Sequence, residues 1–221
     1  GRSTQRDFSV GRVARTTGQR PFAAILSCAD SRIAPELAFD QGPGDLFVVR
    51  LAGNFLNDDA LASMEYAIEV LQVPLILVLG HSNCGAVSAT IKVVQEGTQL
   101  PGHLPGLVNA IRPAVEAAQR RQPANLLVAA TEQNVRLNVA RLTTSEPLLA
   151  GRMASGAIRA VGGVYELSSG KVSLVFQAFH LLPNMTAEEN VAAPRLAVDY
   201  WGLAANARLR DVVAFEAKTL I

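Results

Sequence analysis

Two apolar runs that end in chemically active side chains organise the sequence. The first covers residues 22–28 and ends at Cys28, and the second covers residues 74–80 and leads into His81 and Cys84. A short apolar run between turn signals is typical of a strand that is buried on both faces of a parallel sheet. Because open α/β sheets collect their chemistry at the carboxyl ends of their strands, we expect these three side chains to lie at one edge.

The rest of the chain alternates between strand-like and helix-like patterns. Further strands are expected at residues 45–52, 157–165 and 171–176, the last two joined as a hairpin. Helices are expected from an N-cap at Asp58 or Asp59, from Gly85, over residues 107–120 with an interruption at Pro113, and over residues 125–142. This alternation predicts an α/β fold with a mostly parallel central sheet, helices on both faces and an antiparallel edge strand.

The two ends of the chain differ from this middle part. Residues 7–17 could form a short helix, but its apolar face is too thin to fold alone, so residues 1–20 are expected to form an N-terminal arm. Residues 176–221 are Ala-rich and amphipathic and are expected to form a helical C-terminal appendage. The α/β domain itself is expected to span residues 21–175.

Composition and charge exclude several classes of function. The chain is 49% hydrophobic and 18% charged, which argues against disorder of its bulk. Its 20 basic residues are dispersed and the formal net charge is +1, so we expect no nucleic-acid partner. No run reaches 18 uninterrupted apolar residues, so we expect no membrane insertion. No signal peptide is recognisable, and a cytoplasmic location is expected.

Cys28, His81 and Cys84 form a candidate zinc site. Zinc prefers thiolate and imidazole ligands, and a catalytic site supplies three of them and keeps a fourth position open. The chain has only two cysteines, so no third thiol is available to close the site. The alternatives are a disulfide or reactive thiols, an inert core cysteine, and for His81 a satisfied core histidine.

Asp30 and Arg32 stand close to the first cysteine in the sequence. The carboxylate of Asp30 could be a fourth metal ligand, or it could accept a hydrogen bond from a metal-bound water. A charge-assisted pair with Arg32 would favour the second role. The simpler interpretation is a surface ion pair worth less than about 1 kcal/mol.

The two motifs together resemble a known family. Cys28-Ala-Asp-Ser-Arg32, followed at this distance by His81-Ser-Asn-Cys84-Gly85, resembles the β-class carbonic anhydrases, and the likeness covers about residues 7–175. The resemblance implies that Cys28, His81 and Cys84 bind one Zn²⁺ per subunit and that Asp30 pairs with Arg32. It also implies reversible hydration of carbon dioxide to bicarbonate and a proton, by a zinc-bound hydroxide that the Asp30–Arg32 pair orients.

The resemblance further implies a homodimer or a dimer of dimers, in which residues 1–20 embrace the neighbouring subunit. The substrate pocket would lie at the subunit interface, and its positions match Gln19 (from the partner), Phe47, Tyr66 and the backbone N–H of Gly85. Some members carry a non-catalytic bicarbonate pocket, whose Trp, Arg and Tyr positions correspond here to Ile25, Arg50 and Tyr66. With Ile25 in place of Trp, we expect that pocket to be incomplete and the metal site to stay open.

Two further expectations concern the C-terminal region and the reaction. Residues from about 175 to 194 resemble the segment around the glutamine loop of ABC transporter ATPases, but the chain has no phosphate-binding loop, so nucleotide binding is not expected. Hydrolysis of a related heterocumulene, carbon disulfide or carbonyl sulfide, is an alternative activity on the same centre. A non-catalytic zinc-dependent bicarbonate-binding module is the alternative outside enzymes.

Overall fold

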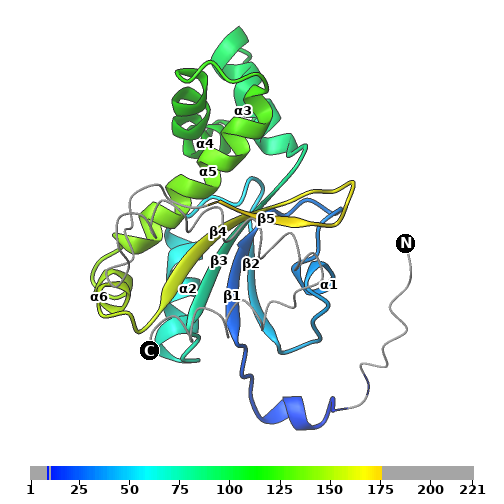
Figure 1. Cartoon of the computed structure of the whole chain (residues 1–221), viewed down its shortest axis with the longest axis vertical. Coiled ribbons are helices and arrows are strands. Elements are labelled where there is room, and N and C mark those ends of the chain that lie inside the picture. Colours follow the sequence, from blue (N-terminus) through cyan, green and yellow to red (C-terminus); the bar gives the residue numbers. More distant parts are fainter. Residues whose placement is uncertain (1–8, 10, 176–221) are drawn as a thin grey trace, which may run out of the picture.

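One five-stranded sheet forms the centre of the protein, of which the computed structural model describes residue 9 and residues 11–175 (Figure 1). The strands are β1 (Ala23–Ser27), β2 (Leu46–Arg50), β3 (Leu75–His81), β4 (Arg159–Tyr165) and β5 (Val172–Val175). Their order is β2-β1-β3-β4-β5; every neighbouring pair is parallel except β4 and β5, which are antiparallel. The predicted parallel sheet with an antiparallel edge strand is therefore confirmed.

Helices lie on both faces of the sheet, as predicted. Within residues 11–175 they are the 3₁₀ helix η1 (Ala14–Thr17), α1 (Pro35–Ala38), α2 (Asp58–Glu69), α3 (Gly85–Glu96), α4 (Leu104–Gln119), α5 (Leu126–Thr143) and α6 (Leu149–Ala154). Helices α2, α5 and α6 pack on one face, and α1 lies on the side of the other. Figure 1 shows α3 and α4 standing beyond the carboxyl edge of the sheet, with α5 running from them along the strands.

The two central strands carry apolar residues on both faces. Every residue of β1 and of β3 is buried. Because successive strand residues point to opposite faces, Leu26 and Ile76 join the core under α2 and α5, while Ile25 and Leu77 join the core on the α1 side. Burial on both faces explains why these strands read as continuous apolar runs rather than alternating ones.

The predicted starts of two helices, α2 and α4, are wrong. The N-cap of α2 is Asn57, whose side-chain oxygen accepts a hydrogen bond from the backbone N–H of Ala60 at 2.9 Å. Asp58 and Asp59, the predicted caps, occupy the first turn instead, where their charges complement the positive end of the helix. The sequence offers three consecutive polar residues at this position, and pattern alone does not choose among them.

Pro113 does not interrupt the predicted helix. Helix α4 begins earlier than predicted, at Leu104, and runs through Pro113 to Gln119. Proline leaves one carbonyl of the preceding turn, that of Asn109, without its intrahelical partner. Both residues lie on the exposed side, where water can satisfy this carbonyl. The short helix α6 was not predicted at all.

Several predictions fall on the ends of the chain. Of the predicted helix at residues 7–17, the described part contains only η1. Residues 176–221, including nearly all of the segment that resembles an ABC transporter ATPase, lie outside the described residues. Among the helices that are described, none has both the length and the apolar character needed to cross a membrane.

Helix α5 approaches the sheet closely because two glycines leave room for it. A Cβ atom on Gly162 would lie 2.6 Å from Val135 Cγ1 and 3.2 Å from Val139 Cγ2. A Cβ atom on Gly80 would lie 2.8 Å from Val135 Cγ2. The contact between α5 and strands β3 and β4 therefore requires the absence of side chains at these positions.

We expect Gly162→Ala to lower the free energy of unfolding by about 1–3 kcal/mol, because the added methyl overpacks the contact with α5. Gly151→Ala, in α6, is the control: nothing lies within 4 Å of its Cβ position. This helical substitution should raise stability by about 0.5–1 kcal/mol. Urea denaturation followed by circular dichroism measures both, and equal stability of the two variants would contradict the packing explanation.

Candidate metal centre

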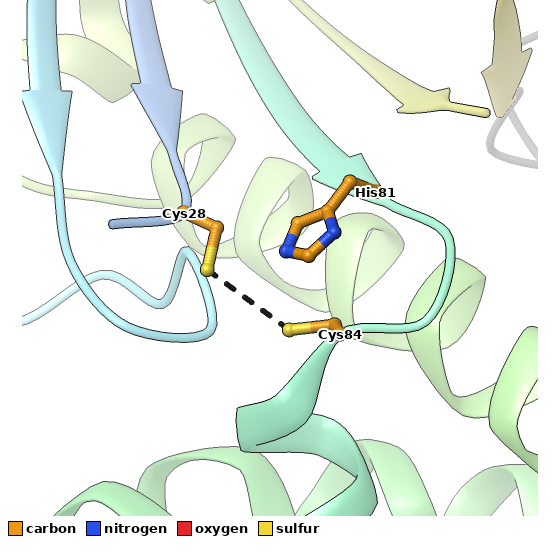
Figure 2. Close-up of side chains that lie close together, drawn as sticks. All are labelled: Cys28, His81 and Cys84. Atoms are coloured by element: carbon orange, nitrogen blue, oxygen red, sulfur yellow. Dashed lines mark hydrogen bonds between the residues drawn. The ribbon is translucent and has the colours of Figure 1, made fainter. Parts of the chain in front are cut away.

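The fold brings the three predicted ligands together at one edge of the sheet. Cys28 directly follows β1, His81 is the last residue of β3, and Cys84 is the N-cap residue of α3. Strands β1 and β3 are parallel neighbours with Ser27 beside Leu79, so their carboxyl ends meet. Figure 2 shows the three side chains converging from these two strand ends and the start of α3.

The distances in this cluster suit a metal ion. The sulfur atoms of Cys28 and Cys84 are 4.0 Å apart, and the three candidate ligand atoms all lie within 4.8 Å of one another (Figure 2). Two sulfurs at about 2.3 Å from a tetrahedral zinc ion would be roughly 3.8 Å apart. Both cysteines are free thiols, and their separation is far from the roughly 2 Å of a disulfide bond.

His81 supplies the independent test of whether these residues fit a metal. Its side chain is fully buried, and Nδ1 lies 2.9 Å from the carbonyl oxygen of Ser82, to which it can donate a hydrogen bond. Nε2, on the other side of the ring, is buried without any hydrogen-bond partner. A buried ring nitrogen without a partner is costly, and a metal ion beside it would remove that cost.

The two thiols are electrostatically different. The hydrogen bond from Cys84, together with His81 and the backbone N–H groups of Gly53 and Asp30, outweighs burial and lowers the pKa of Cys28 to about 4. The adjacent Cys28 thiolate, with burial, raises the pKa of Cys84. Burial lowers the pKa of His81, but the neighbouring Cys28 thiolate raises it overall. The cluster therefore contains a thiolate, whose negative charge a cation beside its sulfur would neutralise.

Asp30 is held by Arg32 rather than by the cluster. The guanidinium donates two hydrogen bonds, from Nε to Oδ1 at 2.9 Å and from Nη2 to Oδ2 at 2.7 Å. The backbone N–H of Arg32 donates a third to Oδ1 at 2.9 Å. These bonds hold the pKa of Asp30 well below its usual range, so the side chain is an ionised acceptor. Its Oδ2 lies 3.8 Å from Nε2 of His81, beside the cluster.

Arg50 supports the turn that carries Cys28 and Asp30, and sequence reasoning missed this role. Its guanidinium donates to the carbonyl oxygens of Cys28 (3.0 Å), Asp30 (2.7 Å) and Ile33 (2.8 Å). Arg50 ends β2, the neighbour of β1, so it lies at the same sheet edge as the candidate ligands. The strand-end rule that singled out Cys28 and His81 could have singled out Arg50 as well.

Ser82 connects the cluster to the β4–β5 hairpin. Its hydroxyl donates to Oε1 of Glu166 at 2.9 Å and accepts from the backbone N–H of Leu167 at 3.0 Å. These bonds hold the peptide whose carbonyl faces Nδ1 of His81. Neither Ser82 nor Glu166 was predicted as part of the site.

Three of the four predicted pocket residues lie away from the metal centre of their own chain. Phe47 pairs with Ala24, four residues before Cys28, which corresponds to roughly 13 Å along the strand. The ring of Tyr66 lies against Phe47, with centroids 6.2 Å apart, and Gln19 precedes β1 at its amino end. Only Gly85, the first residue of α3, adjoins the cluster.

The residues that correspond to the non-catalytic bicarbonate pocket are not gathered within the chain. Ile25 packs in the core on the α1 side of the sheet, together with Tyr165. Tyr66, on α2, lies on the opposite side. The guanidinium of Arg50 is bonded to backbone carbonyls, as described above. That this pocket is incomplete stays a prediction.

The arrangement defines a class of protein: an α/β fold with a buried centre of two thiols and one imidazole at the carboxyl ends of parallel strands. The family model described as carbonic anhydrase matches residues 23–172. The chain is 40% identical to carbonic anhydrase 2 of Mycobacterium tuberculosis over 163 residues, which cover 74% of this chain and 78% of the relative. A carbonic anhydrase of Mycolicibacterium smegmatis is also 40% identical, with 74% and 79% covered.

Solved structures agree with this match. The β-carbonic anhydrase CcaA superimposes with a TM-score of 0.65 at 30% identity, covering 76% of this chain and 86% of that one. The Coccomyxa β-carbonic anhydrase, solved with acetazolamide, has a TM-score of 0.69 at 26% identity, covering 84% and 82%. The chain belongs to the carbonic anhydrase family, in its β class. It is an enzyme of reversible carbon dioxide hydration, and neither alternative function is favoured.

We expect Arg50→Gln to lower carbon dioxide hydration by about 10- to 100-fold, the usual effect of removing a group that supports a metal ligand. The three carbonyls of the turn would lose their common donor. Arg152→Gln is the matched control, because Arg152 forms an equally good two-point bond with Glu69, remote from the cluster. Stopped-flow assays of both zinc-loaded variants measure the difference. An Arg50→Gln variant as active as Arg152→Gln would contradict the supporting role of Arg50.

Proposed function

We propose that Cys28, His81 and Cys84 hold one Zn²⁺ per chain, at which carbon dioxide is hydrated. The observation that carries this proposal is the unpartnered, buried Nε2 of His81 beside two free thiols 4.0 Å apart. Two sulfurs and one nitrogen are a donor set that zinc prefers, and three protein ligands leave one coordination position for solvent. A bound zinc ion would lower the pKa of a coordinated water to about 7 and so supply hydroxide near neutral pH.

Asp30 has the role of orienting the attacking hydroxide. As an ionised carboxylate it can only accept hydrogen bonds, and Arg32 fixes the direction of both oxygens. The pair with Arg32 supports the role of acceptor over that of fourth metal ligand. The backbone N–H of Gly85, at the positive end of α3, is suited to donate to the negative oxygen that develops as bicarbonate forms.

The remaining pocket residues, in this proposal, come from a second copy of the chain. Gln19 and Phe47 lie toward the amino ends of β1 and β2, too far from Cys28 to line the same centre. Tyr66 is 47% exposed although it is aromatic, and Val70 on the same helix is 59% exposed. An apolar surface of this kind is suited to an interface. We accordingly propose a homodimer or dimer of dimers, with residues 1–20 as the exchanged arm.

The proposed division is a catalytic domain at residues 21–175 between that arm and an appendage at residues 176–221. A cytoplasmic location stays a prediction. The paired state of Asp30, together with Ile25 in place of Trp, supports an open metal site without strong inhibition by bicarbonate.

Elemental analysis of the purified protein should find one zinc per chain. Cys84→Ser should reduce the zinc content to near zero after dialysis against a weak chelator, because a neutral hydroxyl replaces a thiolate. Ser88→Ala, one helical turn into α3, is the control and should keep its zinc. A wild-type chain that holds no zinc, or that contains a Cys28–Cys84 disulfide, would overturn the proposed function.

Asp30→Asn should retain zinc but lose hydration activity by about 10²-fold or more, because the amide replaces one acceptor with a donor and disturbs the oriented hydrogen bond. Asp59→Asn, an exposed position in the first turn of α2, is the matched control. Stopped-flow hydration assays on zinc-loaded protein, with carbon disulfide as a parallel substrate, make the comparison. Unchanged turnover in Asp30→Asn would exclude the orienting role.

A further inference from the structure

Helix α5 carries a stripe of polar residues on a face that packs against the protein interior. Thr131, Asn134, Asn138 and Arg141 follow one another at spacings of three and four residues, which places them on one side of the helix. Thr131, Asn134 and Asn138 are between 2% and 7% exposed. Buried amides are costly unless they are hydrogen-bonded, so the partners of this stripe indicate its purpose.

Asn134, Asn138 and Arg141 bond to backbone groups of the loop between β2 and α2, whereas the hydroxyl of Thr131 donates to the carbonyl oxygen of Leu127 in its own helix. Nδ2 of Asn134 donates to the carbonyl oxygen of Gly53 at 2.8 Å. Oδ1 of Asn138 accepts from the backbone N–H of Leu56 at 2.7 Å, and Nη1 of Arg141 donates to the carbonyl oxygen of Leu56. Nδ2 of Asn138 donates to the backbone oxygen of Asn134 at 2.8 Å and to its Oδ1 at 3.2 Å, and the second bond links the two side-chain amides. The stripe therefore forms hydrogen bonds with this loop at both ends of residues 53–56.

Gly53 connects the stripe to the metal centre. Its carbonyl oxygen is held by Asn134, and its N–H points at Sγ of Cys28, with nitrogen and sulfur 3.2 Å apart. Its φ is +85°, and a Cβ atom here would lie 2.4 Å from Ile111 Cδ1, so only glycine fits. Glycine is also the residue with the least intrinsic restraint on its backbone. The bond from Asn134 to the Gly53 carbonyl therefore restrains the backbone next to this N–H, together with the bond from the Asn54 N–H to the carbonyl oxygen of Leu51.

We propose that Asn134 is a positioning residue of the metal centre: by holding the Gly53 carbonyl, it aims the Gly53 N–H at Cys28 and sets how tightly that thiolate retains a metal ion. This inference rests on the proposed zinc site. An N–H group bonded to a ligand sulfur fixes the position of that sulfur and draws electron density from it. Its loss therefore loosens the hold of the ligand on the metal and raises the energy of the sulfur lone pairs. A purely structural Asn134 would stabilise the fold without affecting that bond.

The test compares two substitutions on the same helix in the zinc-loaded, full-length protein. Asn134→Leu keeps the branched shape and the number of heavy atoms of the side chain and removes the donor to Gly53. Val139→Ala removes two buried methyl groups that have no polar partner, so it destabilises the fold without touching the loop. Two quantities are measured in each variant: the rate at which zinc passes to a chromogenic chelator, and the sulfur-to-metal charge-transfer absorption after replacement of zinc by cobalt(II).

Asn134→Leu should release zinc about 10-fold faster than the wild type, in the lower part of the range for groups that support metal ligands. Its charge-transfer band should move to longer wavelength. Val139→Ala should match the wild type in both measurements, although its unfolding midpoint falls. Should Asn134→Leu not fold, Asn134→Ala replaces it with the same expectations.

Wild-type rates and spectra in a folded Asn134 variant would overturn the inference and leave the zinc site intact. Equal changes in Val139→Ala would also overturn it, because they would trace the effect to general stability. A wild-type chain that binds no zinc would instead remove the proposed function itself, so the two failures are distinguishable.

Discussion

The parallel pairing of β1 with β3 determines where all the chemistry of this protein lies. The two strands are buried along their whole length, so neither can slip or tilt without exposing apolar residues on one face of the sheet. Their register places Ser27 beside Leu79, and the next residues along each strand deliver a thiol and an imidazole to one point. The cluster is therefore a consequence of strand pairing, with only Cys84 added by the turn into α3.

The position of the cluster at the ends of buried strands imposes a second constraint, because water does not reach polar atoms there. The side chains of Cys28, His81 and Cys84 are almost inaccessible to water, whereas Arg32 is 53% exposed. Inside, each polar group must find a partner from the protein or from a metal. Outside, Asp30 and Arg32 can pair at the rim, where solvent and substrate arrive. Under the proposed function, the residues that bind the metal thus lie in the interior, and those that act on the substrate lie at the surface.

The sequence located the candidate ligands better than the residues whose hydrogen bonds hold them in place. Cys28, His81 and Cys84 stand at strand ends that the hydrophobic pattern can locate, and their residue types are the ones that zinc prefers as ligands. Arg50 and Asn134 bond to backbone carbonyls of loops, and no residue pattern shows where such a carbonyl will point. The predicted interruption at Pro113 was wrong for a related reason. A proline is tolerated inside a helix more easily where water reaches the carbonyl that it leaves unpaired, and the sequence does not show which carbonyls are exposed. What the sequence did offer for Asn134 and Asn138 was two amides at i and i+4 on a helix with apolar neighbours.

The predicted pocket residues and the candidate metal ligands differ in whether a second copy of the chain is needed to bring them together. Under the proposed assembly, Gln19, Phe47 and Tyr66 reach the substrate only from a second copy, so substrate contacts depend on association. The candidate ligands and their supports come instead from the ends of β1, β2 and β3, the start of α3, and α5 of a single chain, held by Arg50 and by Asn134 through Gly53. In this proposal, the centre can acquire its metal before subunits associate. Retention of the metal and turnover of the substrate are then set by different contacts, and a change at the interface can alter the second while leaving the first untouched.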